Sequence, residues 1–438
     1  MKLLNIILAT ILITIYSNSF AAPAVEPKEL KLELSAKIIN DIYGFIERNH
    51  VDEVKKQEVF ENAIKGMLSG LDPHSDFLKP KEQKKMMEHT SGKFGGIGIV
   101  ISKKDDFIEI ISPIDDTPGY KAGLKSGDLI VKINDKVIRK MSLEDSVVLM
   151  RGKPGTKVRL TISRKNKPPF EVKIVRDIIT IVSAKGYLLD KDLAYIRISS
   201  FQAPTASLVI KTLEKLTAQN KKQHSSKKLK SIIVDLRNNP GGLIDSSVDI
   251  SDIFLPKDKL VVYTKGKKAI SKIEYLTKKD DLTGNAKIVV LVNQGSASAS
   301  EIVSGALQDH KRAVIVGSKT FGKGSVQSVI PIRGGYGIKI TIARYYTPND
   351  RSIQAKGIIP DVELEELEIK EKNTATVSVS VSERDLENHL EASENDKNNT
   401  REATIIPDKD LDEIDRLKQD YFIRQATSIL KVLNLDLK

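Results

Sequence analysis

Three serines separated by single alanines form the segment with the clearest chemical potential: Ser296, Ser298 and Ser300. They follow an apolar run at 288–292 that predicts a buried strand, and they precede a periodic apolar stretch that predicts a helix. A serine at such a junction lies where free N–H groups and the helix dipole favour negative charge on a tetrahedral intermediate. The alternative interpretation is that all three serines only cap the helix.

A lysine between two glycines provides a candidate general base for such a serine. Lys323 stands between Gly322 and Gly324, where the missing side chains allow the backbone to approach another strand end closely. Burial lowers the pKa of a lysine amine because it disfavours the charged form, so a buried Lys323 could activate a serine hydroxyl. Gln327, four residues further on, could orient the amine with its side-chain carbonyl.

The stretch around this lysine also resembles a phosphate-binding loop. Gly324 stands where such a loop needs a hydroxyl residue, and β-branched residues at 326–332 and 338–343 favour strands over the helix that a P-loop opens. Nucleotide binding is therefore the weaker interpretation. His310 leaves a Ser-His-Asp arrangement open as an alternative. The six histidines show no metal-ligand spacing, so we expect neither a metal site nor a cofactor.

An acyl-transfer site also needs donors for the oxyanion. Gly241 and Gly242 follow a buried-strand run at 231–236, and their backbone N–H groups have no side chain to shield them. An ordinary tight turn would show the same pattern. The turn is a candidate oxyanion site only because the same chain also contains the serine and lysine segments.

The elements that must position these residues change character along the chain. At 438 residues the chain exceeds the size at which one core keeps growing, so we expect several globular parts. Strand and helix patterns alternate at 180–365, which predicts an α/β layer with ligand sites at the carboxyl ends of its strands. The parts are a signal peptide at 1–22, a helical segment at 23–90, short strands at 91–179, an α/β core at 180–365, and a polar linker with an amphipathic helix (411–433) at 366–438.

The N-terminal residues have the pattern of a secretory signal. Lys2 precedes an apolar run shorter than a membrane-spanning helix, and Ala21 and Ala22 offer a cleavage site, with an uncleaved anchor as the alternative. The chain has no cysteine, so disulfides and thiolate chemistry are excluded. A net charge of +12 is spread over many segments and does not favour nucleic acid in an exported protein, although it could favour an anionic membrane surface.

The short-strand part has the pattern of a peptide-binding domain. Gly96 and Gly98 free backbone N–H groups that could hold a terminal carboxylate. A predicted strand at 97–101, which includes Ile97 and Ile99, could accept an extended tail as an added strand. A glycine-rich hairpin that merely packs is the alternative interpretation.

Four ordered motifs at 235–242, 295–301, 322–327 and 345–361 resemble those of the carboxyl-terminal processing, or tail-specific, proteases. The resemblance runs from about residue 38 to 362 and implies a PDZ domain inserted before a crotonase/ClpP-like α/β protease core. It assigns the nucleophile to Ser298, the general base to Lys323 with Gln327 as its orienting partner, and the oxyanion hole to Gly242 and Ala299.

Two further residues match positions that this family uses with less regularity. Asp309 corresponds to a position sometimes assigned to a charge relay, although a continuous helix would place it about 16 Å from Ser298. Arg151 resembles a residue that couples the PDZ domain to the active site.

The resemblance predicts an exported serine endopeptidase of the Gram-negative periplasm, either soluble or peripherally attached to the membrane. It would bind the C-terminal tails of envelope proteins through its PDZ domain and cleave them through an acyl-enzyme. We expect a homodimer, and an adaptor protein is a further candidate partner. The alternative is an inactive PDZ scaffold on a degenerate protease core.

Overall fold

The structure is a computed structural model that describes residues 32–104, 106–139, 141–267, 272–364 and 412–435. The predicted signal peptide and the polar linker therefore lie outside the described residues. The chain divides into two compact units, residues 1–66 and 67–438. No helix within the described ranges combines the length and the hydropathy that a membrane crossing requires.

The first part of the chain is helical, as the apolar periodicity predicts. Helix α2 spans Leu32–Asn49 and helix α3 spans Lys56–Ser69, with the rings of Tyr43 and Phe60 5.1 Å apart. A short strand then interrupts the predicted helical segment: β1 (Asp76–Leu78) precedes helix α4 (Pro80–Ser91), which the sequence analysis did not separate. The predicted helical segment at 23–90 thus also contains the three-residue strand β1.

The second part is a small β-rich domain with its own core. Its main sheet runs in the order β3-β4-β5-β7-β8, and β6 pairs with β5. Alternate residues of β7 are buried, as expected of a strand with one face on a core. The strands and helices are β3 (Ile99–Lys104), β4 (Phe107–Pro113), α5 (Pro118–Lys121), β5 (Leu129–Ile133), β6 (Lys136–Val137), α6 (Leu143–Met150), β7 (Lys157–Ser163) and β8 (Phe170–Val175).

The first strand of the main sheet begins later than the strand predicted at 97–101. Strand β2 (Lys93–Gly96) pairs with β9 (Asp177–Thr180) in a separate two-stranded sheet, and β3 begins only at Ile99. Gly98 lies between them with φ +73°, a left-handed conformation that favours glycine and breaks the extended run. A methyl group on Gly98 would also lie 2.3 Å from Cβ of Thr117, so this turn is closely packed.

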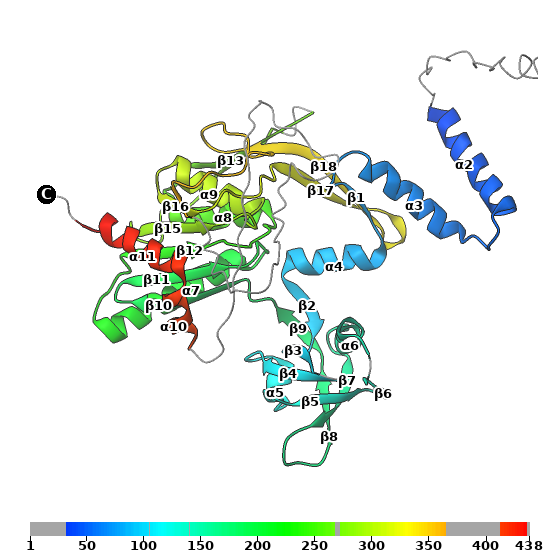
Figure 1. Cartoon of the computed structure of the whole chain (residues 1–438), viewed down its shortest axis with the longest axis horizontal. Coiled ribbons are helices and arrows are strands. Elements are labelled where there is room, and N and C mark those ends of the chain that lie inside the picture. Colours follow the sequence, from blue (N-terminus) through cyan, green and yellow to red (C-terminus); the bar gives the residue numbers. More distant parts are fainter. Residues whose placement is uncertain (1–31, 105, 140, 268–271, 365–411, 436–438) are drawn as a thin grey trace, which may run out of the picture. The chain divides into compact units, whose positions relative to one another are not determined.

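The third part contains a six-stranded sheet in the order β10-β11-β12-β15-β16-β19 (Figure 1), and its pairs from β11 to β19 are parallel. The runs at 231–236, 288–292 and 313–316 are confirmed as strands. Short bulky β-branched runs form central strands because such strands are buried on both faces. The strands are β10 (Ala184–Asp190), β11 (Leu193–Ile198), β12 (Ser231–Asp235), β15 (Lys287–Val292), β16 (Ala313–Gly317) and β19 (Val362–Glu363).

Helices cover both faces of this sheet. On one face Ile232 and Val234 of β12 pack with α7 (Thr205–His224), α8 (Ile244–Phe254) and α9 (Ala299–Asp309). On the other face Ile233 packs with the C-terminal helices. The predicted single helix at 411–433 is wrong in one respect, because it is divided into α10 (Glu413–Gln419) and α11 (Tyr421–Leu433) at Asp420.

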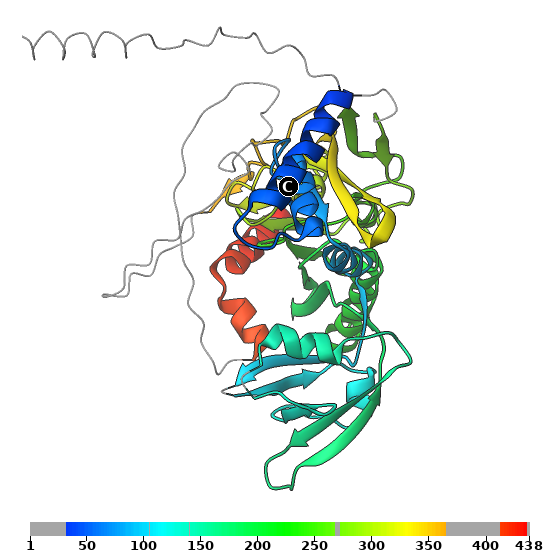
Figure 2. The same cartoon turned by 90° about the vertical axis from the view of Figure 1, so that its right-hand side faces the viewer.

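A second sheet joins distant parts of the chain around a long hairpin (yellow in Figure 2). The hairpin consists of β17 (Ser325–Pro331) and β18 (Gly337–Tyr346). Strand β18 also pairs with β1 near one end and with β13 (Leu260–Gly266) near the other, and β14 (Glu274–Leu276) extends the sheet beyond β13. The strands predicted after Gly324 are confirmed, so this loop does not open the helix that a P-loop requires.

Candidate active site

Ser298 occupies the turn between β15 and α9 in a conformation that non-glycine residues rarely adopt. Its φ is +56° and its ψ is −113°, and Ala299 is the first residue of the helix. Backbone strain of this kind persists where surrounding contacts hold it, and it is common at functional sites. The strand-turn-helix arrangement predicted from the sequence is confirmed.

The three serines of this segment are not equivalent. Ser296 and Ser300 are fully buried, and their hydroxyls donate to the carbonyl oxygens of Leu236 and Asn239 at 2.8 Å. Ser298 is partly exposed. The two outer serines therefore join the loop to its neighbour, and only the hydroxyl of Ser298 is placed to meet a substrate.

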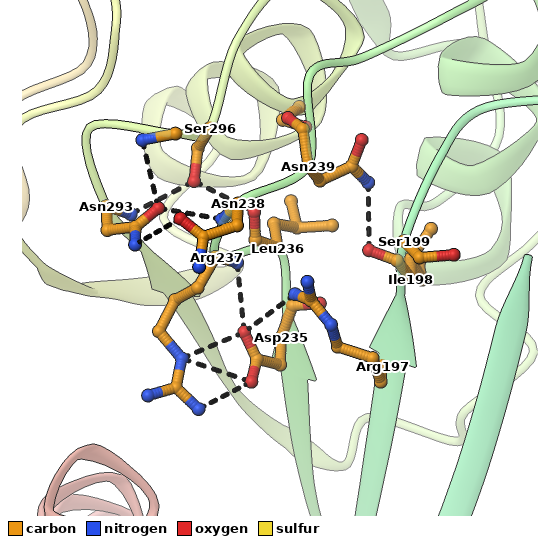
Figure 3. A network of polar contacts seen from close by, with 12 residues as sticks. Arg197, Ile198, Ser199, Asp235, Leu236, Arg237, Asn238, Asn239, Asn293 and Ser296 are labelled. Carbon is orange, nitrogen blue, oxygen red and sulfur yellow. Dashed lines mark hydrogen bonds and ion pairs between the residues drawn. The ribbon is translucent and has the colours of Figure 1, made fainter. Parts of the chain in front are cut away.

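The loop after β12 lies directly against the turn at 293–298 (Figure 3). Asn238 donates its N–H to Oδ1 of Asn293 at 2.8 Å, and Nδ2 of Asn293 returns a bond to Oδ1 of Asn238 at 2.9 Å. The N–H of Ala297 donates to the carbonyl of Asn239 at 3.0 Å. Adjacent parallel strands β12 and β15 end at the same edge of the sheet, so the two loops meet there.

Gly241 packs closely against the turn that holds Ser298. A methyl group on Gly241 would lie 2.8 Å from Cβ of Ser298 and 2.9 Å from the amide nitrogen of Ala299, so only glycine allows this approach. Gly242 has φ +149°, and a methyl group on it would lie 2.1 Å from the carbonyl oxygen of Phe201. Among the described residues we find no acceptor for the N–H groups of Gly242 or Ala299. The oxyanion role of these two N–H groups stays a prediction.

Lys323 lies in the loop between β16 and β17, and two side chains from outside this loop hold its backbone. The hydroxyl of Tyr345 donates to the carbonyl oxygen of Lys323, and the N–H of Gly324 donates to Oε1 of Gln354 at 2.9 Å. Gly322 has φ +96°, which a residue with a side chain would adopt only with strain. Lys323 itself is half-buried.

Glu301 links this lysine to the serine. One of its carboxylate oxygens, Oε2, accepts the N–H of Ser298 at 2.7 Å and the N–H of Lys323 at 3.0 Å. The other, Oε1, accepts the Thr320 hydroxyl at 2.6 Å and the N–H of Gly322 at 2.8 Å. Because one oxygen atom binds both amide nitrogens, the backbones of Ser298 and Lys323 lie side by side.

The role of Glu301 was missed in the sequence analysis, although a signal was present. A glutamate three residues after a serine at a helix start is the spacing of a capping box, in which the glutamate accepts the serine N–H. Here the same carboxylate continues to a second loop. Its side chain is fully buried, and burial raises its pKa to about 7 against the four hydrogen bonds that lower it.

Gln327 lies at the start of β17 with its amide group held. Its Nε2 donates to Oγ of Ser325 at 2.8 Å and to Oγ1 of Thr341 at 3.4 Å. An amide nitrogen carries two N–H groups, so these bonds use both and leave Oε1 as the acceptor. The predicted role of Gln327 needs that free carbonyl, and the role itself stays a prediction.

Comparisons with known proteins agree with this geometry. The model described as Peptidase family S41 matches residues 192–364, and the PDZ domain model matches residues 109–164. The carboxy-terminal-processing protease of Bartonella bacilliformis is 40% identical over 375 residues, which is 85% of this chain and 85% of that protein. The chain belongs to the carboxy-terminal processing serine proteases of family S41.

Two further relatives of the protease are similar over most of its length. The carboxy-terminal processing protease CtpA of Bacillus subtilis is 35% identical over 331 residues, which is 75% of this chain and 68% of that protein. A solved photosystem II D1 C-terminal processing protease is 26% identical, with a TM-score of 0.42, and the match covers 74% of this chain and 86% of that one.

Asp309 and His310 lie at the other end of α9 of the protease. Asp309 forms an ion pair with Arg351 and accepts the N–H of Asn349 at 2.9 Å. The His310 ring bonds to the carbonyl oxygen of Leu260 at 2.7 Å, so the geometry gives no support to a Ser-His-Asp arrangement. The relay role of Asp309 stays a prediction, and its contacts are those of a residue that fixes the 347–352 loop.

The main sheet of the PDZ domain has β3 at one edge and β8 at the other. Strand β3 begins at Ile99, directly after the Ile97-Gly98 turn. Ile97 is buried in the domain core. Arg151 ends helix α6, where it pairs with Glu88 at 2.9 Å and lies over the ring of Phe94. Its coupling role stays a prediction.

Behind the 236–242 loop, a buried ion cluster holds the end of β12 (Figure 3). Asp235 is 1% exposed and pairs with Arg237 at 2.7 Å and Arg197 at 3.2 Å. Burial by itself would raise the pKa of Asp235, but the two guanidinium charges hold it below its usual value. Arg237 also reaches Asp420 at the start of α11, at 3.1 Å. The C-terminal helix is thus connected to the loop that carries Gly242.

Proposed function

We propose that the protease hydrolyses peptide bonds through an acyl-enzyme on Ser298, with Lys323 as general base. The observation that carries the proposal is the shared oxygen of Glu301, which holds the backbones of both residues while Gly241 packs against Ser298. Gln327 would orient the lysine amine, and the N–H groups of Gly242 and Ala299 would bind the oxyanion.

In this mechanism the neutral amine of Lys323 takes the proton of the Ser298 hydroxyl as the oxygen attacks the substrate carbonyl. The tetrahedral oxyanion accepts hydrogen bonds from Gly242 and Ala299, which stabilise it in a site whose donors are already in place. Lys323 then gives its proton to the leaving amine, and the C–N bond breaks. Water enters, loses a proton to the same amine, and its attack releases the acid product and the serine.

A serine-reactive probe tests these assignments directly. We expect the probe to label the protease, and both labelling and peptide cleavage to be lost in Ser298→Ala and in Lys323→Ala. Ser428→Ala, which removes an exposed hydroxyl on α11, serves as the matched control and should leave both unchanged. Cleavage by a folded Ser298→Ala variant would refute the mechanism, and the loss of both activities excludes the inactive scaffold.

We further propose that the substrates are polypeptides whose free C-terminal tails add to the edge of β3, with the 96–98 turn holding the carboxylate. The open edge supports this, because main-chain pairing on an exposed strand is a common mode of peptide binding in PDZ domains. Precursor or damaged envelope proteins would fit this specificity. Cross-linking of a tailed substrate to a Ser298→Ala variant, followed by mass spectrometry, identifies the substrates and any adaptor.

Export to the periplasm and self-association are proposals with separate support. The pattern of residues 1–22 supports export with cleavage, which N-terminal sequencing of the protein recovered from cells measures. Exposed apolar residues on α2 support a homodimer: Ile38, Ile42 and Phe45 are 38%, 54% and 64% exposed. Sedimentation of the full chain reports its oligomeric state.

A further inference from the structure

The turn at 72–75, far from Lys323 in sequence, contacts strand β18, which lies opposite Gln327. Thr341 lies directly across from Gln327 in the β17–β18 hairpin. On its other side, the side chain of Asp72 accepts the Thr341 hydroxyl at 3.1 Å, and Oγ of Ser75 accepts the Thr341 N–H at 3.1 Å. The turn before β1 is therefore attached to the strand that faces the orienting glutamine.

Asp72 has the environment of a carboxylate that stays ionised. It is 3% exposed, and it accepts the N–H groups of His74 and Ser75 and the Ser75 hydroxyl at 2.8, 2.9 and 2.6 Å. Burial alone would raise the pKa of Asp72, but the bonds from Ser75, His74 and Thr341 hold it below its usual value. An ionised carboxylate has no proton to donate, so every group bonded to it must be a donor.

This requirement fixes the direction of the bonds between Asp72 and Gln327. A threonine hydroxyl has one proton, and Thr341 gives it to Asp72. Its oxygen can then only accept from Gln327, which donates one N–H at 3.4 Å while the other goes to Ser325. If the Thr341 proton were free to point at Gln327 instead, the amide could turn and present N–H groups where a carbonyl is needed.

We infer that Asp72 and Thr341 are positioning residues that set the orientation of the Gln327 amide, so that its carbonyl oxygen faces the general base. This inference rests on the proposed role of Lys323 and deepens it. The amine of Lys323 would donate an N–H to that carbonyl and keep its lone pair for the serine proton. Neither positioning residue touches the substrate, and their effect passes through Gln327.

The test removes the hydroxyl of Thr341 and asks whether its effect depends on Gln327. Thr341→Val keeps the backbone bond to Ser75 and loses only the hydroxyl, and Thr341→Ser restores the hydroxyl. We expect Thr341→Val to lower kcat about tenfold, the size expected when one hydrogen bond of a coupled set is lost, with KM for a short peptide unchanged. Thr341→Ser should return kcat to within about twofold of the parent protein.

The decisive comparison is the same substitution in a Gln327→Ala background. If Thr341 acts through Gln327, Thr341→Val should change kcat there by less than about twofold, because interacting residues are non-additive. A fall of equal size in both backgrounds would overturn the inference, as would an unchanged kcat in Thr341→Val or a change in KM alone. Thr341→Ala carries the same expectation and replaces Thr341→Val if the valine variant does not fold.

The outcome is separable from that of the proposed mechanism. Cleavage by Ser298→Ala would remove the mechanism and this inference together. Loss of cleavage in Ser298→Ala and Lys323→Ala, with no effect of Thr341→Val, would leave the mechanism standing and overturn only the positioning role.

Discussion

At the scale of single residues, the geometry of the site depends most directly on Glu301. Its two carboxylate oxygens accept four donors, and three of these are backbone N–H groups of Ser298, Gly322 and Lys323. A glutamine has one acceptor oxygen, so Glu301→Gln would set an amide nitrogen against two donors. Each buried donor left without an acceptor costs about 1–3 kcal/mol. We therefore expect kcat/KM to fall at least tenfold, which steady-state assays measure.

The same substitution should change how stability depends on pH. Burial raises the pKa of Glu301 from 4.5 to about 7, so between these values the folded chain binds this proton more tightly than the unfolded chain. The contribution of this group to the free energy of unfolding is therefore greatest below pH 4.5. It falls by about 3 kcal/mol as the pH rises to 7.

Urea unfolding across that range measures the effect. Glu301→Gln should lack this part of the pH dependence, whereas Glu363→Gln, an exposed glutamate at the end of β19, should keep it. Parallel profiles for the parent protein and Glu301→Gln would show that the carboxyl does not titrate in this window.

At the scale of elements, Asp420 both begins the C-terminal helix α11 and connects it to the loop after β12. This residue caps the helix by accepting the N–H of Ile423 at 3.0 Å, and it pairs with Arg237 of the loop after β12. Asp420→Asn keeps a capping oxygen and loses the charge, whereas Asp420→Ala loses both. We expect the free energy of unfolding to fall by about 1 kcal/mol in the asparagine variant and by about 2 kcal/mol in the alanine variant.

The matched control for this helix is Asp412→Ala at the start of α10, which removes a capping residue without an Arg237 contact. Asp412→Ala should lower the free energy of unfolding by no more than the loss of a helix cap alone. Equal losses in Asp420→Asn and Asp420→Ala would mean that the ion pair accounts for the whole effect and the cap contributes nothing. A kcat decrease confined to the two Asp420 variants would indicate that α11 also supports the loop of Gly242.

At the scale of the whole molecule, tail capture and cleavage belong to different parts of the chain. Gly98→Ala places a methyl group against Thr117 in the turn before β3, whereas Gly155→Ala, with φ +86°, meets no atom within 4 Å. Both substitutions carry left-handed strain, about 1 kcal/mol, in the same domain. Only Gly98→Ala should weaken binding of a tail peptide, by about tenfold or more, in fluorescence anisotropy with Ser298→Ala as the parent.

Kinetics of the active protease complete this comparison. Gly98→Ala should raise KM for a substrate with a free C-terminal tail and leave cleavage of a short untailed peptide unchanged. An amidated tail should bind the unsubstituted domain more weakly than a free carboxylate. Equal loss of binding in Gly98→Ala and Gly155→Ala would indicate domain destabilisation and not loss of the carboxylate site.

Local pattern predicted the parts of the protease that depend on local causes. The strands β12, β15 and β16 follow from buried β-branched runs, and the turn at Ser298 follows from the change to helical periodicity after it. The glycines around Lys323 and at 241–242 indicated close backbone approaches, which the structure confirms. The PDZ domain and the protease family followed from motif order. Two local details were predicted wrongly: the strand expected at 97–101 begins at Ile99, and the helix expected at 411–433 is divided at Asp420.

The sequence by itself determined which residue types could attack, take a proton and bind an oxyanion, because glycine freedom, helix starts and strand periodicity act over a few neighbouring residues. The fold alone decided which carboxylates support them. Asp72 meets Thr341 across 269 positions, and Glu301 reaches Lys323 across 22, so no local pattern indicates either bond. Hydrogen-bond partners of buried groups are chosen by which elements the core brings together, and that choice exists only once the chain has folded.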